Sequence, residues 1–73
     1  MISTGEIITT SDDKKYYCFD SILDDNINYL YLCLLEDQTK IFFAKQIADE
    51  IQLLSKKDEK LHVLNLFKNK LAN

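Results

Sequence analysis

The spacing of apolar residues changes abruptly near Ser55, and this change constrains the fold more than any other feature. Before Ser55, apolar residues occur in short blocks separated by Asp, Asn and Ser clusters, which is typical of strands joined by turns. After it, they recur at Leu61, Leu64, Phe67 and Leu71, the spacing of one helical stripe. The sequence therefore predicts an α+β domain in which a small sheet is followed by one amphipathic helix.

Four strands are predicted, each rich in β-branched or aromatic residues, and they cover residues 6–10, 15–23, 27–35 and 40–47. Because the separations are short, neighbouring strands must be antiparallel, and the simplest order is a meander. Residues 48–54 form a connector that fits either one helical turn or a bend. The helix covers residues 55–72 and packs on one face of the sheet. All 73 residues form a single domain.

The predicted turns divide the side chains of the sheet between two faces, because successive residues of a strand point to opposite sides. With turns at Asp25-Asn26 and Asp37-Gln38, Cys18 lies opposite Cys33. The more apolar face then contains Ile8, Tyr17, Phe19, Leu23, Leu30, Leu32, Leu34, Ile41 and Phe43. The second face contains Tyr16, Cys18, Asp20, Ile22, Tyr29, Tyr31, Cys33 and Phe42. We expect the helix on the first of these faces.

The residues at both ends of the helix suit a helix start and a helix end. Ser55 is placed to cap the first turn, with Asp58 three residues later as a short capping box. Acidic Asp58 lies near the positive end of the helix dipole, and basic Lys68 and Lys70 lie near its negative end.

The aromatic residues of the second face suggest a protein-binding surface. If one helix covers one face, the residues left towards solvent are Tyr16, Ile22, Tyr29, Tyr31 and Phe42. Contiguous aromatic surface of this kind marks interfaces, and tyrosine is favoured there. We expect a non-enzymatic module that uses this face for homodimerisation or for a protein partner. The alternative is that the tyrosines are simply half exposed, with their hydroxyls in water.

Charge is unevenly distributed along the chain. Residues 1–54 carry ten acids and four lysines, a net −6, whereas residues 55–73 carry five lysines and two acids, a net +3. Arginine is absent, which disfavours nucleic acid as a partner. The acidic half suggests a second hypothesis, a phage- or plasmid-type inhibitor that blocks a nucleic-acid-binding site on an enzyme. However, most acidic pairs fall where turns are expected, and Asp is favoured in turns for its local hydrogen bonds.

Residues capable of chemistry are few and scattered, so we expect no catalytic, cofactor or metal site. Cys18 and Cys33 could form a disulfide or half of a metal site, but reduced, half-buried thiols are the simpler expectation. His62 has no catalytic partner by spacing, and Gly5 is the sole glycine, which excludes a glycine-rich phosphate loop. We therefore expect no enzyme activity.

The sequence also bears on where the protein resides. No apolar run approaches the roughly 20 residues of a membrane span. The N-terminus lacks the basic and apolar regions of a secretory signal, and two cysteines do not suggest a disulfide scaffold. We expect a cytoplasmic protein without membrane contact.

Several segments resemble the YrzB-type family of short uncharacterised proteins from low-GC Gram-positive bacteria. They are Asp12-Asp13-Lys14-Lys15-Tyr16-Tyr17-Cys18, Tyr29-Leu30-Tyr31-Leu32, Leu35-Glu36-Asp37, Ser55-Lys56-Lys57-Asp58-Glu59 and Val63-Leu64-Asn65-Leu66-Phe67. The chain lacks that family's long acidic insert and its Glu-Trp pair at the helix start. The resemblance implies a small sheet-plus-helix domain with no established activity.

Overall fold

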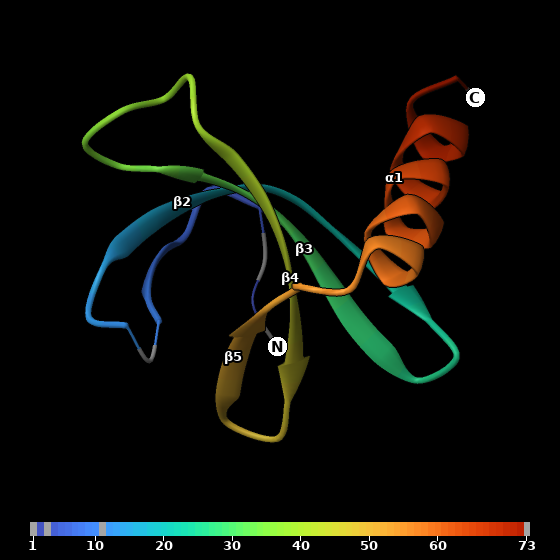
Figure 1. Cartoon of the computed structure of the whole chain (residues 1–73), viewed down its shortest axis with the longest axis horizontal. Coiled ribbons are helices and arrows are strands. Elements are labelled where there is room, and N and C mark those ends of the chain that lie inside the picture. Colours follow the sequence, from blue (N-terminus) through green and yellow to red (C-terminus); the bar gives the residue numbers. More distant parts are fainter. Residues whose placement is uncertain (1, 3, 11, 73) are drawn as a thin grey trace.

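The computed structural model describes residues 2, 4–10 and 12–72. Over these residues the chain forms five antiparallel strands in meander order and one helix, which confirms the predicted α+β class. The elements are β1 (Ile7–Thr9), β2 (Lys15–Asp24), β3 (Ile27–Leu34), β4 (Ile41–Ile47), β5 (Glu50–Leu53) and α1 (Lys57–Ala72). Figure 1 shows a curled sheet with α1 on one side of it. No helix in this part of the chain is long and apolar enough to cross a membrane.

The expected four-stranded sheet is one strand short, because β5 lies in the predicted connector, residues 48–54. β4 and β5 are joined at Ala48-Asp49, where Ala48 has a φ of 55°, and Ile47 pairs directly with Glu50. Glu50 is exposed and Ile51 is buried, and the residues of β5 alternate between polar and apolar types, which is the period of a strand. This period-two pattern overrides the helical spacing that the same segment also fits.

The predicted turn at Asp25-Asn26 is confirmed. Both residues have positive φ values, 52° and 64°, as in a two-residue type I′ hairpin. From this turn the pairing of β2 with β3 is regular as far as Asp20, which lies opposite Tyr31.

A β-bulge at Phe19 interrupts this regular pairing. The register shifts between Cys18 and Asp20, so that Cys18 pairs with Leu32. The predicted pairing of Cys18 with Cys33 is therefore wrong, because a bulge places two residues of one strand opposite one residue of the other. The β2 residues that precede the bulge, residues 15–18, therefore lie on the opposite face from the one predicted.

The connection between β3 and β4 also differs from the predicted turn at Asp37-Gln38. Lys40 N donates to the carbonyl of Asp37 at 3.1 Å, and Leu34 N donates to Lys40 O at 3.1 Å. This loop is longer than a two-residue turn, and Leu32 therefore pairs with Phe42 instead of Phe43. A shift of one residue moves every side chain of β4 to the opposite face from the one expected.

One face of the sheet, the inner face, is covered by the curl of the sheet itself. Its buried cluster consists of Ile8, Tyr16, Cys18, Leu30, Leu32, Ala44 and Ile51. Ile8 on β1 and Ile51 on β5 come from opposite edges of the sheet, so the edges approach one another. Ile2 packs against this cluster, and its N–H donates to Gln46 Oε1 at 3.2 Å. The expectation that α1 covers this leucine-rich face is wrong, because the face is already filled.

The helix covers the opposite face, the helix face. Val63 and Phe67 are its buried residues, and they pack with Tyr29 and Leu54. Ile22, Ile27, Tyr31, Phe43 and Leu66 complete this second cluster. The helix begins at Lys57, two residues after the predicted cap: Lys60 N donates to Lys56 O at 3.0 Å, which makes Lys56 the N-cap residue.

Candidate protein-binding surface

The five residues predicted to form an exposed binding face are divided between the two faces and largely covered. Tyr16 and Phe42 lie on the inner face, where their rings meet edge to face at 5.6 Å. Ile22, Tyr29 and Tyr31 lie on the helix face in the cluster that α1 covers. Tyr16 is only 1% exposed and Tyr29 only 5%. The expected solvent-facing patch of tyrosines is therefore absent from these five positions.

Burial and local contacts define the roles of the two most buried tyrosines. The hydroxyl of Tyr16 donates to Asp12 Oδ2 at 3.2 Å, which ties β2 to the preceding turn. Burial raises the pKa of Tyr16, and the nearby Asp12 carboxylate raises it further. Burial likewise raises the pKa of Tyr29. Both residues stabilise the fold and are unavailable to a partner.

The helix exposes apolar residues that the sequence assigned to the core. Of the predicted stripe, Phe67 is buried, Leu64 is half-buried, and Leu61 and Leu71 are 48% and 74% exposed. Val63, which the prediction placed beside the stripe, is fully buried. The helix is therefore rotated about its axis relative to the prediction. The flank that carries Leu61, Leu64 and Leu71, the leucine flank, is left partly uncovered beside the sheet.

Next to this leucine flank, the helix face of the sheet carries further exposed apolar residues. Phe19, the residue at the bulge, is 44% exposed, and Ile41 at the start of β4 is 41% exposed. We call the combined area the helix-flank surface, and its apolar members are Phe19, Ile41, Leu61, Leu64 and Leu71. The bulge that displaced Tyr16 is also what leaves Phe19 on this side.

Two hollows lie along the helix-flank surface. One, of about 350 Å³, lies between Ile41 on β4 and Leu61 and Leu64 on α1. The other, of about 260 Å³, lies between Phe19 on β2 and Leu71 near the end of α1. Both hollows border the same flank of the helix, so a single elongated partner segment can reach both.

Aromatic rings form a continuous floor between the two hollows. Phe19 meets Tyr31 edge to face at a centroid distance of 5.7 Å, and Tyr31 meets Phe43 and Phe67 at 5.3 and 5.6 Å. Phe43 and Phe67 are stacked at 5.8 Å. Tyr17 extends the row beyond Phe19, at 5.3 Å. Such interlocked rings make a rigid floor, since each ring is held by its neighbours.

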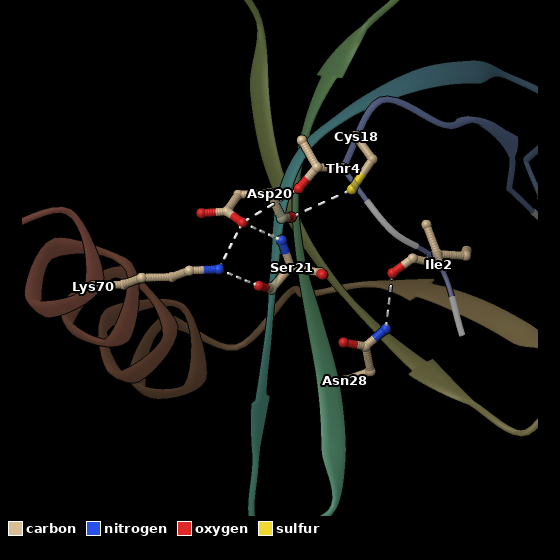
Figure 2. Close-up of polar contacts among 7 residues, drawn as sticks. All are labelled: Ile2, Thr4, Cys18, Asp20, Ser21, Asn28 and Lys70. Carbon is tan, nitrogen blue, oxygen red and sulfur yellow. Dashed lines mark hydrogen bonds and ion pairs between the residues drawn. The ribbon is translucent and has the colours of Figure 1, made fainter.

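Asp20 joins the sheet to the C-terminal part of α1, beside the second hollow. Figure 2 shows Lys70 reaching both the Asp20 carboxylate and the carbonyl of Ser21, each at 2.7 Å. Burial alone would raise the pKa of Asp20, but hydrogen bonds from Lys70 and from the Ser21 N–H outweigh it and lower that pKa. The carboxylate is thus ionised and already occupied by protein groups.

The two cysteines lie on opposite faces of the sheet and are free thiols. Both are buried, more deeply than the half-buried state we expected. The Cys18 thiol donates to the carbonyl of Asp20 at 3.3 Å, and burial raises the pKa of Cys18. Among the described residues, no three His, Cys, Asp or Glu side chains lie close enough together to hold a metal ion.

His62 is placed to hold the helix against the sheet. Its Nε2 lies 3.0 Å from Asp24 Oδ2 at the end of β2, and its ring lies 6.3 Å from that of Tyr29. Both members of the pair are substantially exposed to solvent. An exposed pair of this kind contributes only modestly to the stability of the fold.

The acidic pairs act in turns, as the sequence predicted for most of them. Asp12 accepts hydrogen bonds from the Thr10 hydroxyl and from Lys14 N, and Asp37 accepts from the hydroxyl and N–H of Thr39. The Thr10 and Thr39 hydroxyls lower the pKa of Asp12 and of Asp37, respectively. These carboxylates are engaged locally, which weakens the hypothesis that they imitate a phosphate backbone.

Comparisons with protein-family models, with curated proteins and with solved structures each gave no match to this chain. The resemblance to the YrzB-type family therefore stays a prediction. Function must be argued from the helix-flank surface itself.

Proposed function

We propose that this chain is a small non-enzymatic protein-binding module, and that it binds its partner through the helix-flank surface. The observation that carries the proposal is the exposure of Leu61 and Leu71 beside exposed Phe19 and Ile41, over a rigid aromatic floor. Contiguous apolar surface rimmed by polar residues marks protein interaction sites. The partner-binding role stays as the sequence suggested, but the residues that serve it are different.

The proposal is tested by replacing Leu71 with Asp. Because Leu71 is largely exposed, L71D should leave the fold intact while placing a charge within the contact. The tagged chain is used to capture proteins from a lysate of its native host, and retained proteins are compared between variants by mass spectrometry. L71D should lose the specific partner, by at least about tenfold in recovery, as expected for a charge introduced into an apolar contact.

The control is Leu23→Asp, because Leu23 is also an exposed leucine but lies beside the Asp25-Asn26 turn, away from the helix-flank surface. L23D should retain the same partner as the unchanged chain. Equal capture by L71D and L23D, with both variants folded by circular dichroism, would contradict the proposed site.

A further inference from the structure

The two flanks of α1 differ in charge. In a helix with 3.6 residues per turn, positions 57, 60, 61, 64, 68 and 71 fall on the flank that borders the helix-flank surface. These positions hold three lysines and three leucines, namely Lys57, Lys60, Leu61, Leu64, Lys68 and Leu71. The opposite flank holds Glu59, His62, Leu66, Asn69 and Lys70, so its one acid and one lysine balance, and Asp58 and Asn65 lie on the outward side between the two flanks. This flank therefore combines three leucines with a net charge of +3.

The ion pairs between helix and sheet do not use these lysines. Glu59 pairs with Lys45 at 3.1 Å, His62 lies against Asp24, and Lys70 pairs with Asp20. Within residues 2, 4–10 and 12–72, Lys57, Lys60 and Lys68 take part in none of the ion pairs. Their charges are thus available to a group outside the chain.

The two hollows of the helix-flank surface offer almost no acidic groups that would neutralise this flank. Of the described residues that line the two hollows, Asp20 is the only acid, and Lys70 already holds it. The chain as a whole has a net charge of −3, yet the rim of the helix-flank surface is positive. A ligand that complements this rim must bring negative charge towards α1, beside an apolar strip.

The dimensions of the surface match a short helix. From Lys57 to Leu71 the helix advances by about 21 Å, at 1.5 Å per residue, which equals roughly four turns of a second helix. Leu61, Leu64, Lys68 and Leu71 are spaced alternately three and four residues apart, the spacing that receives a partner helix. A helix laid beside α1 would cover the floor formed by Phe19 and the other rings.

We propose that the helix-flank surface binds an amphipathic helical segment of another protein, whose apolar stripe is bordered by Asp or Glu. This inference rests on the proposed function and specifies the chemistry of the partner. A second copy of the chain is disfavoured at this site, because a symmetric contact would place the lysine-bordered flank of α1 against the same flank of its partner.

The test uses three synthetic helical peptides of about 16 residues, long enough for four turns. They share leucines at alternating spacings of three and four, and the bordering positions are all Glu, all Gln or all Lys. Binding to the full chain is measured by fluorescence anisotropy at low salt. The Glu peptide should bind about tenfold more tightly than the Lys peptide, with the Gln peptide between them, since each exposed charge pair contributes modestly. Raising the salt should reduce this preference.

Two sets of variants place the effect on the helix-flank surface. The double variant Lys60→Glu with Lys68→Glu should remove or invert the preference for the Glu peptide. Lys14→Glu, which changes an exposed lysine in the turn before β2, should preserve it. L71D should abolish binding of all three peptides.

The outcomes separate this inference from the proposed function. Equal affinity for the three peptides, lost in L71D, would overturn the acidic partner while supporting an apolar binding site. A dimer that L71D dissociates in sedimentation velocity, without peptide binding, would identify a second copy as the occupant and would overturn the inference alone. If no peptide binds and the chain is monomeric, the inference is overturned, and the capture comparison of L71D with L23D decides the proposed function.

Discussion

At the residue scale, Phe67 is the side chain that joins the helix to the sheet. Its ring stacks on Phe43 and meets Tyr31 edge to face, and it is 1% exposed. Leu71 lies one turn further along the same helix and is mostly exposed. The two residues belong to one stripe in the sequence but have opposite roles in the structure, one in the core and one at the candidate site.

Replacing each of these two residues with alanine should therefore have very different effects on stability. Phe67→Ala removes buried ring contacts and leaves a cavity, so the free energy of unfolding should fall by roughly 3–5 kcal/mol. Leu71→Ala should change the free energy of unfolding by less than about 0.5 kcal/mol, because side chains that are mostly exposed to solvent contribute little to stability. Urea unfolding followed by circular dichroism measures both. Similar losses for the two variants would mean that Leu71 is also in the core.

At the element scale, the β4–β5 hairpin is the part of the fold that the sequence did not predict. Its turn places Ala48 at a φ of 55°, in the left-handed region that residues with a Cβ rarely adopt. The short segment of residues 48–54 fits a helical turn and a strand alike, and burial of Ile51 against the inner face decides between them. Strand alternation over four residues was the signal available in the sequence.

Ala48→Gly should stabilise the protein, because glycine adopts positive φ without the steric cost of a Cβ. We expect the free energy of unfolding to rise by about 0.5–1 kcal/mol. This gain is the relieved cost of the left-handed conformation, less the entropy that glycine loses when the chain folds. The urea midpoint, at an unchanged slope, measures the gain. The same change at Ala44, a buried residue of β4 without positive φ, should destabilise the protein. A loss of stability in Ala48→Gly would contradict the observed turn.

At the scale of the whole molecule, ion pairs between distant elements hold the helix on the sheet. Lys70 and Asp20 are 50 residues apart in the chain, and their contact closes the C-terminal part of α1 onto β2. Because the pKa of Asp20 is lowered in the folded state, its contribution to stability is present above its ordinary pKa of 3.8. The contribution is lost as the pH falls through the lowered value.

Asp20→Asn should therefore make stability less dependent on pH in acid. At pH 7 the variant should lose at most about 1 kcal/mol of unfolding free energy, since Lys70 is partly exposed and the pair is screened by solvent. Below about pH 4, its stability should converge with that of the unchanged chain. Urea unfolding across this range measures both effects. A pH dependence of Asp20→Asn that matches that of the unchanged chain would exclude Asp20 as the source.

The candidate site shows why the exposed residues of a small sheet are difficult to predict from a sequence pattern. The sequence predicted that one helix would cover one face and leave aromatic residues exposed on the other, but the curled sheet covers its own inner face. However, the bulge at Phe19 reversed the faces of the β2 residues that precede it, and the longer loop before Ile41 reversed the faces of the whole of β4. Tyr16 thus joined the inner core, whereas Tyr29 and Tyr31 kept their predicted face and are covered because the helix packs on it.

The sequence alone determined local properties: four of the five strands, the Asp25-Asn26 turn, the single helix and the order in which these elements follow. These depend on the spacing of apolar residues and on the backbone preferences of a few neighbouring residues. The tertiary structure alone decided which face the helix covers and which of its flanks stays open. The reason is that the curled sheet fills its own inner face with residues from both edges, a contact between distant segments that no local pattern encodes.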